Sequence, residues 1–351
     1  MTRMTTPDSG PPDLNNEPQP APRRSGRFFA CVWGASVAAA LVQPAAWLLS
    51  RSSWTADLIC HFREPALVAT LFSLAASAKT HRRFASALAV LAFAQAWPLL
   101  AYWGPNPVPA DPAAPERFRV LLANVLFDNA NPAELADLIR SEAPDAVVIV
   151  EFNDDCRRAL AGVAGEFPFR TELPSGASGL ALWFRRAPAS MDPPRQLVGG
   201  RNAVLRATFD FAGKPRRLWA VHPTSPLWRA GEPGNPEITA IAHDVASAEG
   251  SKVVVGDFNT TDASGHFRDF VSVTGLRDTR LGFGRQASWP TWSLYRISID
   301  HAFVSDDLAV VDRRLGPVIG SDHFPVVSDL APAAASARRS DAQASHSIGP
   351  R

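Results

Sequence analysis

The chain shows two kinds of hydrophobic pattern, and the change between them falls near residue 104. Before that point apolar residues form long runs, whereas after it they form short runs that end in polar residues. Long apolar runs are typical of membrane helices, and short runs bounded by turn residues are typical of buried strands. The pattern therefore predicts a membrane region followed by a domain that contains a β-sheet.

The membrane region contains two full-length apolar runs and a shorter one between them. Phe28–Ser50 and Phe84–Trp103 are each long enough, at about 20 residues, for a helix to cross roughly 30 Å of hydrocarbon. Pro65–Ala78 has only about 14 residues and reaches the length of a span when Leu58 begins the segment. We predict three spans, at residues 28–50, 58–78 and 84–103.

Basic residues indicate the orientation of these spans. Arg23, Arg24 and Arg27 precede the first run, and Lys79–Arg83 separates the last two. The positive-inside rule places both groups in the cytoplasm, which requires two crossings between them. We therefore expect a multi-pass protein of the inner (cytoplasmic) membrane, with everything after Trp103 on the outer, periplasmic side. The alternatives are two crossings, a cleaved signal peptide in the first run, or a soluble helical domain.

Four further segments complete the organisation of the chain. Residues 1–27 are rich in Pro, Asn and Asp, and residues 331–351 in Ala and Ser, so both are expected to be disordered. Residues 104–117 contain five prolines, which favour extended geometry and a semi-rigid linker. Residues 118–330 have the length of a single domain.

This domain opens with a strand–helix–strand unit, whose strands are expected to be parallel. The strands are Phe118–Asn124 and Asp145–Val150, and Asn131 is the predicted N-cap of the helix between them. Asn124 ends the first strand and Glu151 follows the second. Both side chains should therefore lie side by side at one edge of the sheet.

A third apolar run, within Lys252–Asn259, also ends in polar residues. Its sequence is Lys-Val-Val-Val-Gly-Asp-Phe-Asn, so Asp257 and Asn259 would point to the same side of an extended chain. Open α/β folds place their chemistry at the carboxyl ends of core strands. An Asx turn, with no role in chemistry, is the structural alternative.

Charge and cysteine content narrow the possible functions. The net charge is +1 for the whole chain, but residues 118–330 contain 22 basic and 26 acidic residues. This acidic balance weighs against tight binding of nucleic acid through neutralisation of its phosphates. Cys156 is the one cysteine of the domain, so no disulfide can form within it, and no Cys/His metal-binding spacing occurs.

Polar residues at strand ends continue along the domain in a definite order. They are Asn124, Glu151, His222, Gly256–Asn259, Asp300-His301 and Ser321–His323. Their order resembles that of the endonuclease/exonuclease/phosphatase superfamily, which has the deoxyribonuclease-I-like fold. The resemblance covers about Phe118 to Leu330, and the preceding helices are similar to the bacterial membrane-anchored branch. It implies an α/β (α+β) four-layer sandwich, with two mixed β-sheets packed face to face and helices outside.

The resemblance also implies a metal-dependent phosphoesterase, in which metal-assisted attack of water hydrolyses a phosphodiester or a phosphomonoester. Carboxylate and amide oxygens without a thiolate suit Mg²⁺ or Mn²⁺. The implied metal ligands are Glu151, Asn124 and Asp322. Asp257 would orient or deprotonate the water, and Asn259 would hold a phosphate oxygen or a water on the metal. His323 would stabilise the transition state with Asp300 orienting its ring, and His222 would contact the phosphate or protonate the leaving oxygen.

Two functions from different classes remain open. The first is an active enzyme of the nuclease, phosphatase or phospholipase type, acting on nucleic acid, a phospholipid headgroup or a small phosphoester. The second is a catalytically inactive, membrane-anchored binding module of the same fold. The complete residue set favours the enzyme, because an inactive copy would be free to lose Glu151 or His323. The expected partners are the phosphoester substrate and the membrane, and no protein partner is indicated.

Overall fold

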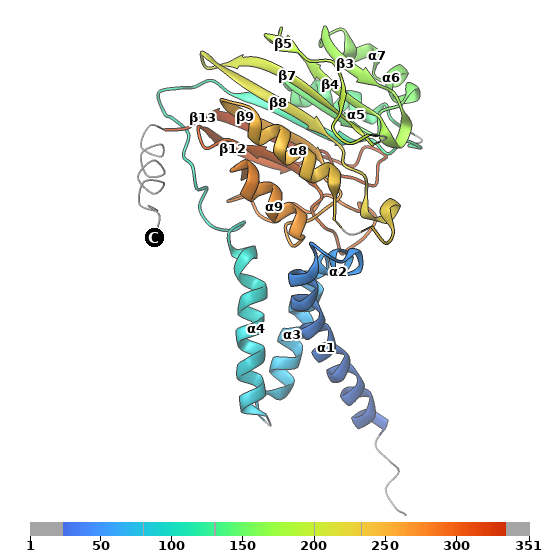
Figure 1. Cartoon of the computed structure of the whole chain (residues 1–351), viewed down its shortest axis with the longest axis vertical. Helices are drawn as coiled ribbons and strands as arrows, with labels where there is room; N and C mark the ends of the chain where they lie inside the picture. The colour runs from blue at the N-terminus through green and yellow to red at the C-terminus, as the bar shows by residue number, and fades with distance from the viewer. Residues whose placement is uncertain (1–23, 80, 130, 200, 233, 335–351) are drawn as a thin grey trace, which may run out of the picture.

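The computed structural model describes residues 24–79, 81–129, 131–199, 201–232 and 234–334. Four helices come first, and a domain built on two β-sheets follows them (Figure 1). Both ends of the chain were predicted to be disordered, and most of their residues, 1–23 and 335–351, lie outside the described part of the chain.

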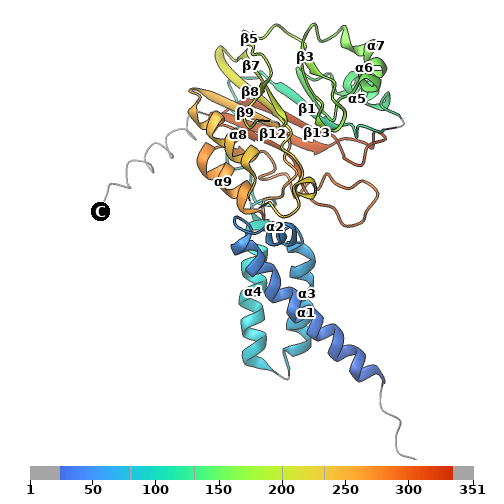
Figure 2. The same ribbon diagram turned by 45° about the vertical axis from the view of Figure 1, so that its right-hand side comes forward.

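Among the described helices, α1 (Arg24–Leu49) and α4 (Arg82–Leu100) are long and apolar enough to cross a membrane. The predicted middle span is formed instead by two helices, α2 (Trp54–Cys60) and α3 (Arg63–Ser77), which meet at 66°. The region therefore has two candidate spans, or three if the bent pair counts as one. In Figures 1 and 2, α1 and α4 run toward the domain, α3 runs away from it, and α2 lies across the end nearest the domain.

The break between α2 and α3 coincides with polar residues that the predicted span had to include. His61 Nδ1 lies 2.8 Å from Thr261 Oγ1, and Arg63 Nη2 donates to Asp262 Oδ2 at 2.6 Å. Because these side chains bind the domain, this part of the chain does not continue as one straight apolar helix.

The domain consists of two mixed sheets. The first has the strand order β12-β13-β1-β2-β4-β3, and the second has the order β10-β11-β9-β8-β7-β5, with β6 paired to β7. The pairs β1/β2 and β8/β9 are parallel, as predicted for the first of them, and the other pairs are antiparallel. The strands of the first sheet are β1 (Phe118–Asn124), β2 (Ala146–Val150), β3 (Phe169–Leu173), β4 (Leu180–Phe184), β12 (Leu308–Leu315) and β13 (Val326–Pro332). Those of the second are β5 (Ser190–Met191), β6 (Arg195–Gln196), β7 (Ala203–Phe211), β8 (Lys214–Val221), β9 (Ser251–Asp257), β10 (Arg277–Asp278) and β11 (Asp300–Val304).

Alternation along each strand builds three apolar layers. Val120 and Leu122 of β1 face the second sheet, and the rings of Phe118 and Phe209 stack there at 4.3 Å, whereas Leu121 faces outward. Two groups of helices cover the outer faces. They are α5 (Glu134–Glu142), α6 (Asp154–Ala159) and α7 (Ala161–Ala164) on the first sheet, and α8 (Pro236–Ser247) and α9 (Gly265–Thr274) on the second. The predicted four-layer sandwich is confirmed.

The start of α5 differs from the prediction that Asn131 caps it. The helix begins at Glu134, and the capping position, Ala133, makes no side-chain hydrogen bond. The Asn131 side-chain amide donates instead to Glu134 Oε1 at 2.7 Å, so it binds the acidic side chain of the first helical residue.

The proline-rich segment 104–117 lies along the domain rather than standing away from it. Asp111 N donates to Pro332 O at 2.8 Å, and Ala334 N donates to Pro109 O at 3.0 Å. Val108 is buried against Ala309. The segment therefore adds little free spacing between the helices and the domain.

Candidate active site

Three strand ends bring polar side chains together where the two sheets meet. Asn124 ends β1, Glu151 follows β2, and Asp257 ends β9. The Asn124 amide donates to Glu151 Oε1 and to Asp257 Oδ2, both at 3.0 Å. The side-by-side placement expected of Asn124 and Glu151 is thus present, and Asn124 also links the two sheets.

The backbone around these strand ends adopts an uncommon conformation. Leu126, Glu151 and Asn259 have φ values of 57°, 61° and 51°, in the left-handed region that costs a non-glycine residue about 1–3 kcal/mol. The Phe127 amide donates to Glu151 Oε2 at 3.0 Å and helps to hold that carboxylate. Strain of this kind persists where the surrounding structure fixes the residue, and it concentrates at functional sites.

The chain does not stay extended after Asp257, contrary to the simplest expectation. The Asn259 amide turns back and donates to Asp257 Oδ1 at 2.8 Å, which is the Asx turn considered as the alternative. The Asn259 side chain donates to Pro223 O at 3.2 Å and still lines the same pocket as Asp257. The turn and a role in the pocket are therefore compatible.

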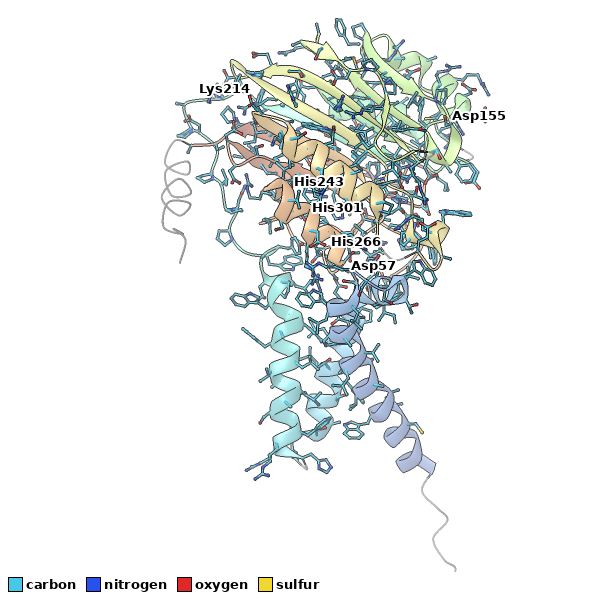
Figure 3. All side chains as sticks on the ribbon, viewed as in Figure 1. Asp57, Asp155, Lys214, His243, His266 and His301 are labelled. Carbon is cyan, nitrogen blue, oxygen red and sulfur yellow. The ribbon has the colours of Figure 1, made fainter. Side chains whose placement is uncertain are left out.

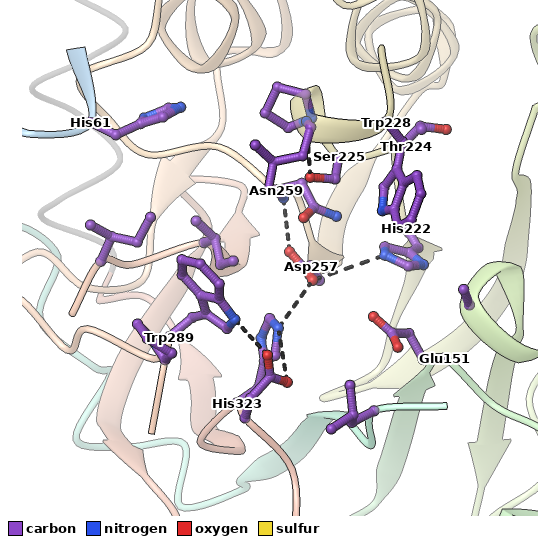
Figure 4. Close-up of a pocket in the computed structure, with 18 of the residues that line it drawn as sticks. His61, Glu151, His222, Thr224, Ser225, Trp228, Asp257, Asn259, Trp289 and His323 are labelled. Atoms are coloured by element: carbon purple, nitrogen blue, oxygen red, sulfur yellow. Dashed lines mark hydrogen bonds and ion pairs between the residues drawn. The ribbon is translucent and has the colours of Figure 1, made fainter. Parts of the chain in front are cut away.

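His323 lies beside Asp257 and is held by Asp300. Its Nε2 is 3.8 Å from Asp257 Oδ2 (Figure 4). Its Nδ1 is 2.8 Å from Asp300 Oδ2. Antiparallel pairing places Asp300 of β11 directly opposite Asp257 of β9. The Ser321 hydroxyl donates to Asn124 O at 2.8 Å and fixes the loop that carries His323.

Burial and neighbouring charges shift the pKa values of Asp257 and His323. Burial, together with the charge of Asp300, raises the pKa of Asp257 to about 7 although His323 opposes the shift. Burial alone would lower the pKa of His323, but Asp300 and Asp257 outweigh it and raise that pKa to about 10. His323 is therefore protonated at neutral pH, whereas Asp257 is poised to exchange a proton.

His222 lies on the other side of Asp257 from His323, as Figure 4 shows, and its pKa is shifted in the opposite direction. Its Nε2 is 3.9 Å from Asp257 Oδ2, and its buried Nδ1 has no hydrogen-bond partner within the described chain. Burial, and next the charge of His323, lower the pKa of His222 to about 4. This imidazole is neutral at pH 7 and can both donate and accept a hydrogen bond.

The oxygen atoms near Glu151 are of the kind that bind a hard cation. Asp322 accepts a hydrogen bond from Trp289 Nε1 at 2.8 Å through Oδ2, while its buried Oδ1 has no hydrogen-bond partner among the described residues. Burial raises the pKa of Glu151, and the Asn124 hydrogen bond opposes this. Carboxylate and amide oxygens without sulfur match the preference of Mg²⁺ and Mn²⁺.

Asp257, Asp300 and His323 form a second group, whose ligand atoms lie within 4.8 Å of one another. The direct hydrogen bond between His323 and Asp300 already uses one atom of each. This group therefore suits proton transfer and charge stabilisation better than metal binding. His301, next to Asp300, points to the opposite face of the strand, where its Nε2 lies 2.8 Å from Thr260 O and its ring packs on Phe267.

These side chains form the floor of a pocket of about 930 Å³. All but two of the implied site residues line it, and the two exceptions, Asn124 and Asp300, lie behind the lining. Sequence reasoning did not foresee the walls, which include Leu58, His61 and Phe62 from the predicted membrane region. The available signal was His61 itself, because a polar residue inside a predicted span usually has a functional or structural partner.

Comparison with known proteins agrees with the fold. Residues 121–323 match the sequence profile of the Endonuclease/Exonuclease/phosphatase family. The structure of D. rerio TDP2 complexed with single strand DNA product superposes with a TM-score of 0.51 and 16% identity, over 61% of this chain and 99% of that one. The endonuclease/exonuclease/phosphatase from Bacteroides vulgatus superposes with a TM-score of 0.50 and 17% identity, over 62% and 99%. No curated protein matches the chain.

Proposed function

The chain belongs to the endonuclease/exonuclease/phosphatase family, and from this premise we propose that it is a membrane-anchored, divalent-metal-dependent phosphoesterase. The observation that carries the proposal is the convergence of Asp257, a protonated His323 and the oxygen donors around Glu151 on the floor of one pocket. A binding module would not need a carboxylate whose pKa lies near neutrality beside a charged imidazole.

The bound ion would be Mg²⁺ or Mn²⁺, held by Glu151, Asn124 and Asp322. When bound, such an ion polarises the phosphate and neutralises its charge. Asp322 Oδ1 accepts no hydrogen bond from the described residues and lies 3.8 Å from His323 Nε2. This oxygen and the two oxygens of Glu151 support the assignment, since each keeps a lone pair free.

In the proposed reaction Asp257 accepts a proton from a water molecule whose oxygen attacks phosphorus. The bond between phosphorus and one ester oxygen breaks, and that oxygen leaves as an alcohol after it takes up a proton, so only water is consumed. His323 donates through Nε2 to the phosphoryl oxygens, where negative charge develops, and Asp300 keeps its ring in one orientation.

Asn259 and neutral His222, which both lie beside Asp257, would contact the phosphate. The low pKa of His222 supports a hydrogen-bonding role rather than the alternative, in which it protonates the leaving oxygen. An imidazole that is neutral at pH 7 is a poor source of a proton at that pH.

We place the domain on the outer, periplasmic side of the inner membrane. Figure 1 supports this orientation, because the start of α1 and the turn between α3 and α4 both lie at the end far from the domain. The basic cluster Lys79–Arg83 lies in that turn and the first residues of α4, and the positive-inside rule assigns it to the cytoplasm.

The test uses the full chain in detergent, with bis(p-nitrophenyl) phosphate as a soluble diester and p-nitrophenyl phosphate as a monoester. We expect hydrolysis that requires Mg²⁺ or Mn²⁺ and stops with a chelator. Asp257→Asn and His323→Gln should each lower the rate at least about 100-fold, as expected for loss of a proton acceptor or a charge-stabilising donor.

His243→Gln and Asp155→Asn are the matched controls, because both side chains are exposed and lie outside the pocket (Figure 3). They should keep the unsubstituted rate. A folded chain that binds Mn²⁺ but hydrolyses neither ester nor any lipid would contradict the proposal and favour the binding module.

A further inference from the structure

We propose that the substrate of this site is a lipid phosphoester, which is hydrolysed while its chains remain in the bilayer. The inference rests on the proposed phosphoesterase function and adds the substrate class. Water oxygen joins phosphorus, one ester P–O bond of the lipid breaks, and the leaving oxygen takes up a proton. The reaction needs no other reactant.

The membrane region forms part of the pocket that contains the reacting groups. Leu58 lines the pocket from α2, and His61 and Phe62 line it from the break before α3 (Figure 4 labels His61). A soluble substrate would have no use for a wall built by the segment that enters the membrane. A lipid reaching the pocket from the bilayer would pass along this wall.

Two loops of the domain complete the mouth of the pocket, and both are bound to the same segment. Trp54 Nε1, at the start of α2, donates to Pro226 O at 2.7 Å. The Tyr295 hydroxyl donates to His61 O at 2.9 Å, and the Tyr295 ring stacks on Phe62 at 6.0 Å. Both loops are thus held where the helices meet the domain.

These loops expose large apolar side chains beside the pocket. Leu227 and Trp228 are 63% and 84% exposed in one loop, and Trp292 and Leu294 are 78% and 104% exposed in the other. Concentrated exposed apolar surface marks a binding or membrane contact, and tryptophan favours the interface between lipid and water. We call these four residues the apolar rim.

The junction between helices and domain fixes the height of the rim above the membrane. Arg63 and Asp262 form a 2.6 Å ion pair whose side chains are only 4% and 13% exposed. The Ser264 hydroxyl donates to Asp57, which lies at this junction in Figure 3. Because these polar contacts are buried, the domain is not free to tilt the rim away from the bilayer.

The charge of the pocket favours a lipid over nucleic acid. Among the described residues that line the pocket there is no Lys or Arg. Binding along a nucleic acid strand depends on such residues to neutralise successive phosphates. A lipid presents one phosphate to the metal site and apolar chains to the rim.

The first experiment tests whether the apolar rim contacts the bilayer, and it does not depend on enzymatic activity. The full chain carrying Cys31→Ala is given Leu294→Cys or Lys214→Cys, labelled with bimane, and placed in nanodiscs of phosphatidylethanolamine and phosphatidylglycerol. Lys214 is exposed and lies far from the helices (Figure 3), and Cys60 and Cys156 are buried. We expect a blue shift and quenching by spin-labelled lipids at position 294 and neither at 214. Equal water exposure at both positions would overturn the inference.

The second experiment compares substrates. Protein in vesicles of the same lipids, with Mg²⁺ or Mn²⁺, is assayed for the products of either P–O cleavage, which are diacylglycerol with a released phosphorylated headgroup or phosphatidic acid with a released alcohol. Soluble bis(p-nitrophenyl) phosphate and single-stranded DNA are assayed beside the lipids. We expect lipid hydrolysis, and a fall of about tenfold in the ratio of lipid to soluble-diester rates in Leu294→Ser and Trp228→Ser. Val311→Ser, an exposed apolar residue outside the pocket, should leave both rates unchanged.

The outcomes separate the two proposals. Hydrolysis of the soluble diester or of DNA without any lipid hydrolysis would keep the proposed function and overturn the lipid substrate. An unchanged rate ratio in both rim variants would also overturn it. Absence of activity on every substrate would instead contradict the proposed phosphoesterase itself.

Discussion

Asp257 lies between two histidines whose proton affinities differ because their surroundings differ. Asp300 is hydrogen-bonded to His323 and, together with Asp257, raises the pKa of that histidine, whereas burial and the charge of His323 lower the pKa of His222. The pKa of Asp300 is itself lowered: burial acts to raise it, but the charge of His323 outweighs that effect. Two buried imidazoles on either side of one carboxylate thereby have different chemistry.

Substitution of Asp300 by Asn tests this role. Asp300→Asn keeps the size of the side chain but removes the charge that holds His323 protonated and oriented, so we expect kcat to fall about 10²–10⁴-fold. The downfield proton signal of His323 Nδ1–H should disappear from the NMR spectrum, whereas the melting temperature should change much less than kcat. A retained signal together with full activity would show that Asp300 only fills space.

For individual residues, the sequence pattern indicated those on the floor of the pocket but not those in its walls. Asp257 and Glu151 stood out because a charged residue directly after an apolar strand is conspicuous in the pattern. Trp228 and Leu294 lie in loops without periodicity, and their position depends on contacts with a helix more than 150 residues away in the chain. Such contacts leave no local signal.

Among the elements, the parallel pair β8/β9 sets the position of Asp257. Gly256 pairs with Val221 at the end of β8, and a Cβ at residue 256 would lie 1.9 Å from Val221 O. Only glycine allows this approach, so the glycine before Asp257 determines how closely the two strands end together.

We therefore expect Gly256→Ala to lower the free energy of unfolding by about 2–3 kcal/mol and to reduce activity, because the backbone must separate and carry Asp257 with it. Thermal or denaturant unfolding measures the first effect. Gly165→Ala is the control, since a Cβ at residue 165 would meet no other atom within 4 Å and the φ of −63° suits alanine. Equal stability of the two variants would argue against the close approach.

Secondary structure was predictable wherever the apolar period was long enough. Strand β1 has the predicted bounds, Phe118–Asn124, and β2 begins one residue later than predicted, at Ala146. The bend after α2 was not predictable, because hydropathy measures only the average polarity of 58–78. It does not show that His61 and Arg63 have partners in a distant loop.

For the whole molecule, two ion pairs at the junction between helices and domain lie in very different surroundings. Arg63 and Asp262 are nearly buried, whereas the side chains of Arg51 and Asp269 are 52% and 48% exposed. Exposed pairs contribute little because water and salt screen them, but a buried charge that loses its partner is costly.

Arg63→Met should accordingly lower the free energy of unfolding of the detergent-solubilised chain by about 3 kcal/mol, because Asp262 keeps its charge without its nearest partner. Arg51→Met should change it by less than about 1 kcal/mol. Thermal unfolding of the two variants provides the comparison, and similar melting temperatures would show that the Arg63 pair does not hold the junction.

The fixed junction also changes how the enzyme would meet its substrate. With the proposed lipid substrate, a pocket held at one height beside the bilayer would explore a plane rather than a volume, so encounters would depend on lateral diffusion of lipids past the mouth. Turnover then follows the mole fraction of substrate in the membrane and not its amount per litre of solution. Inert lipid added to the same bilayer would act as a competitor simply by dilution.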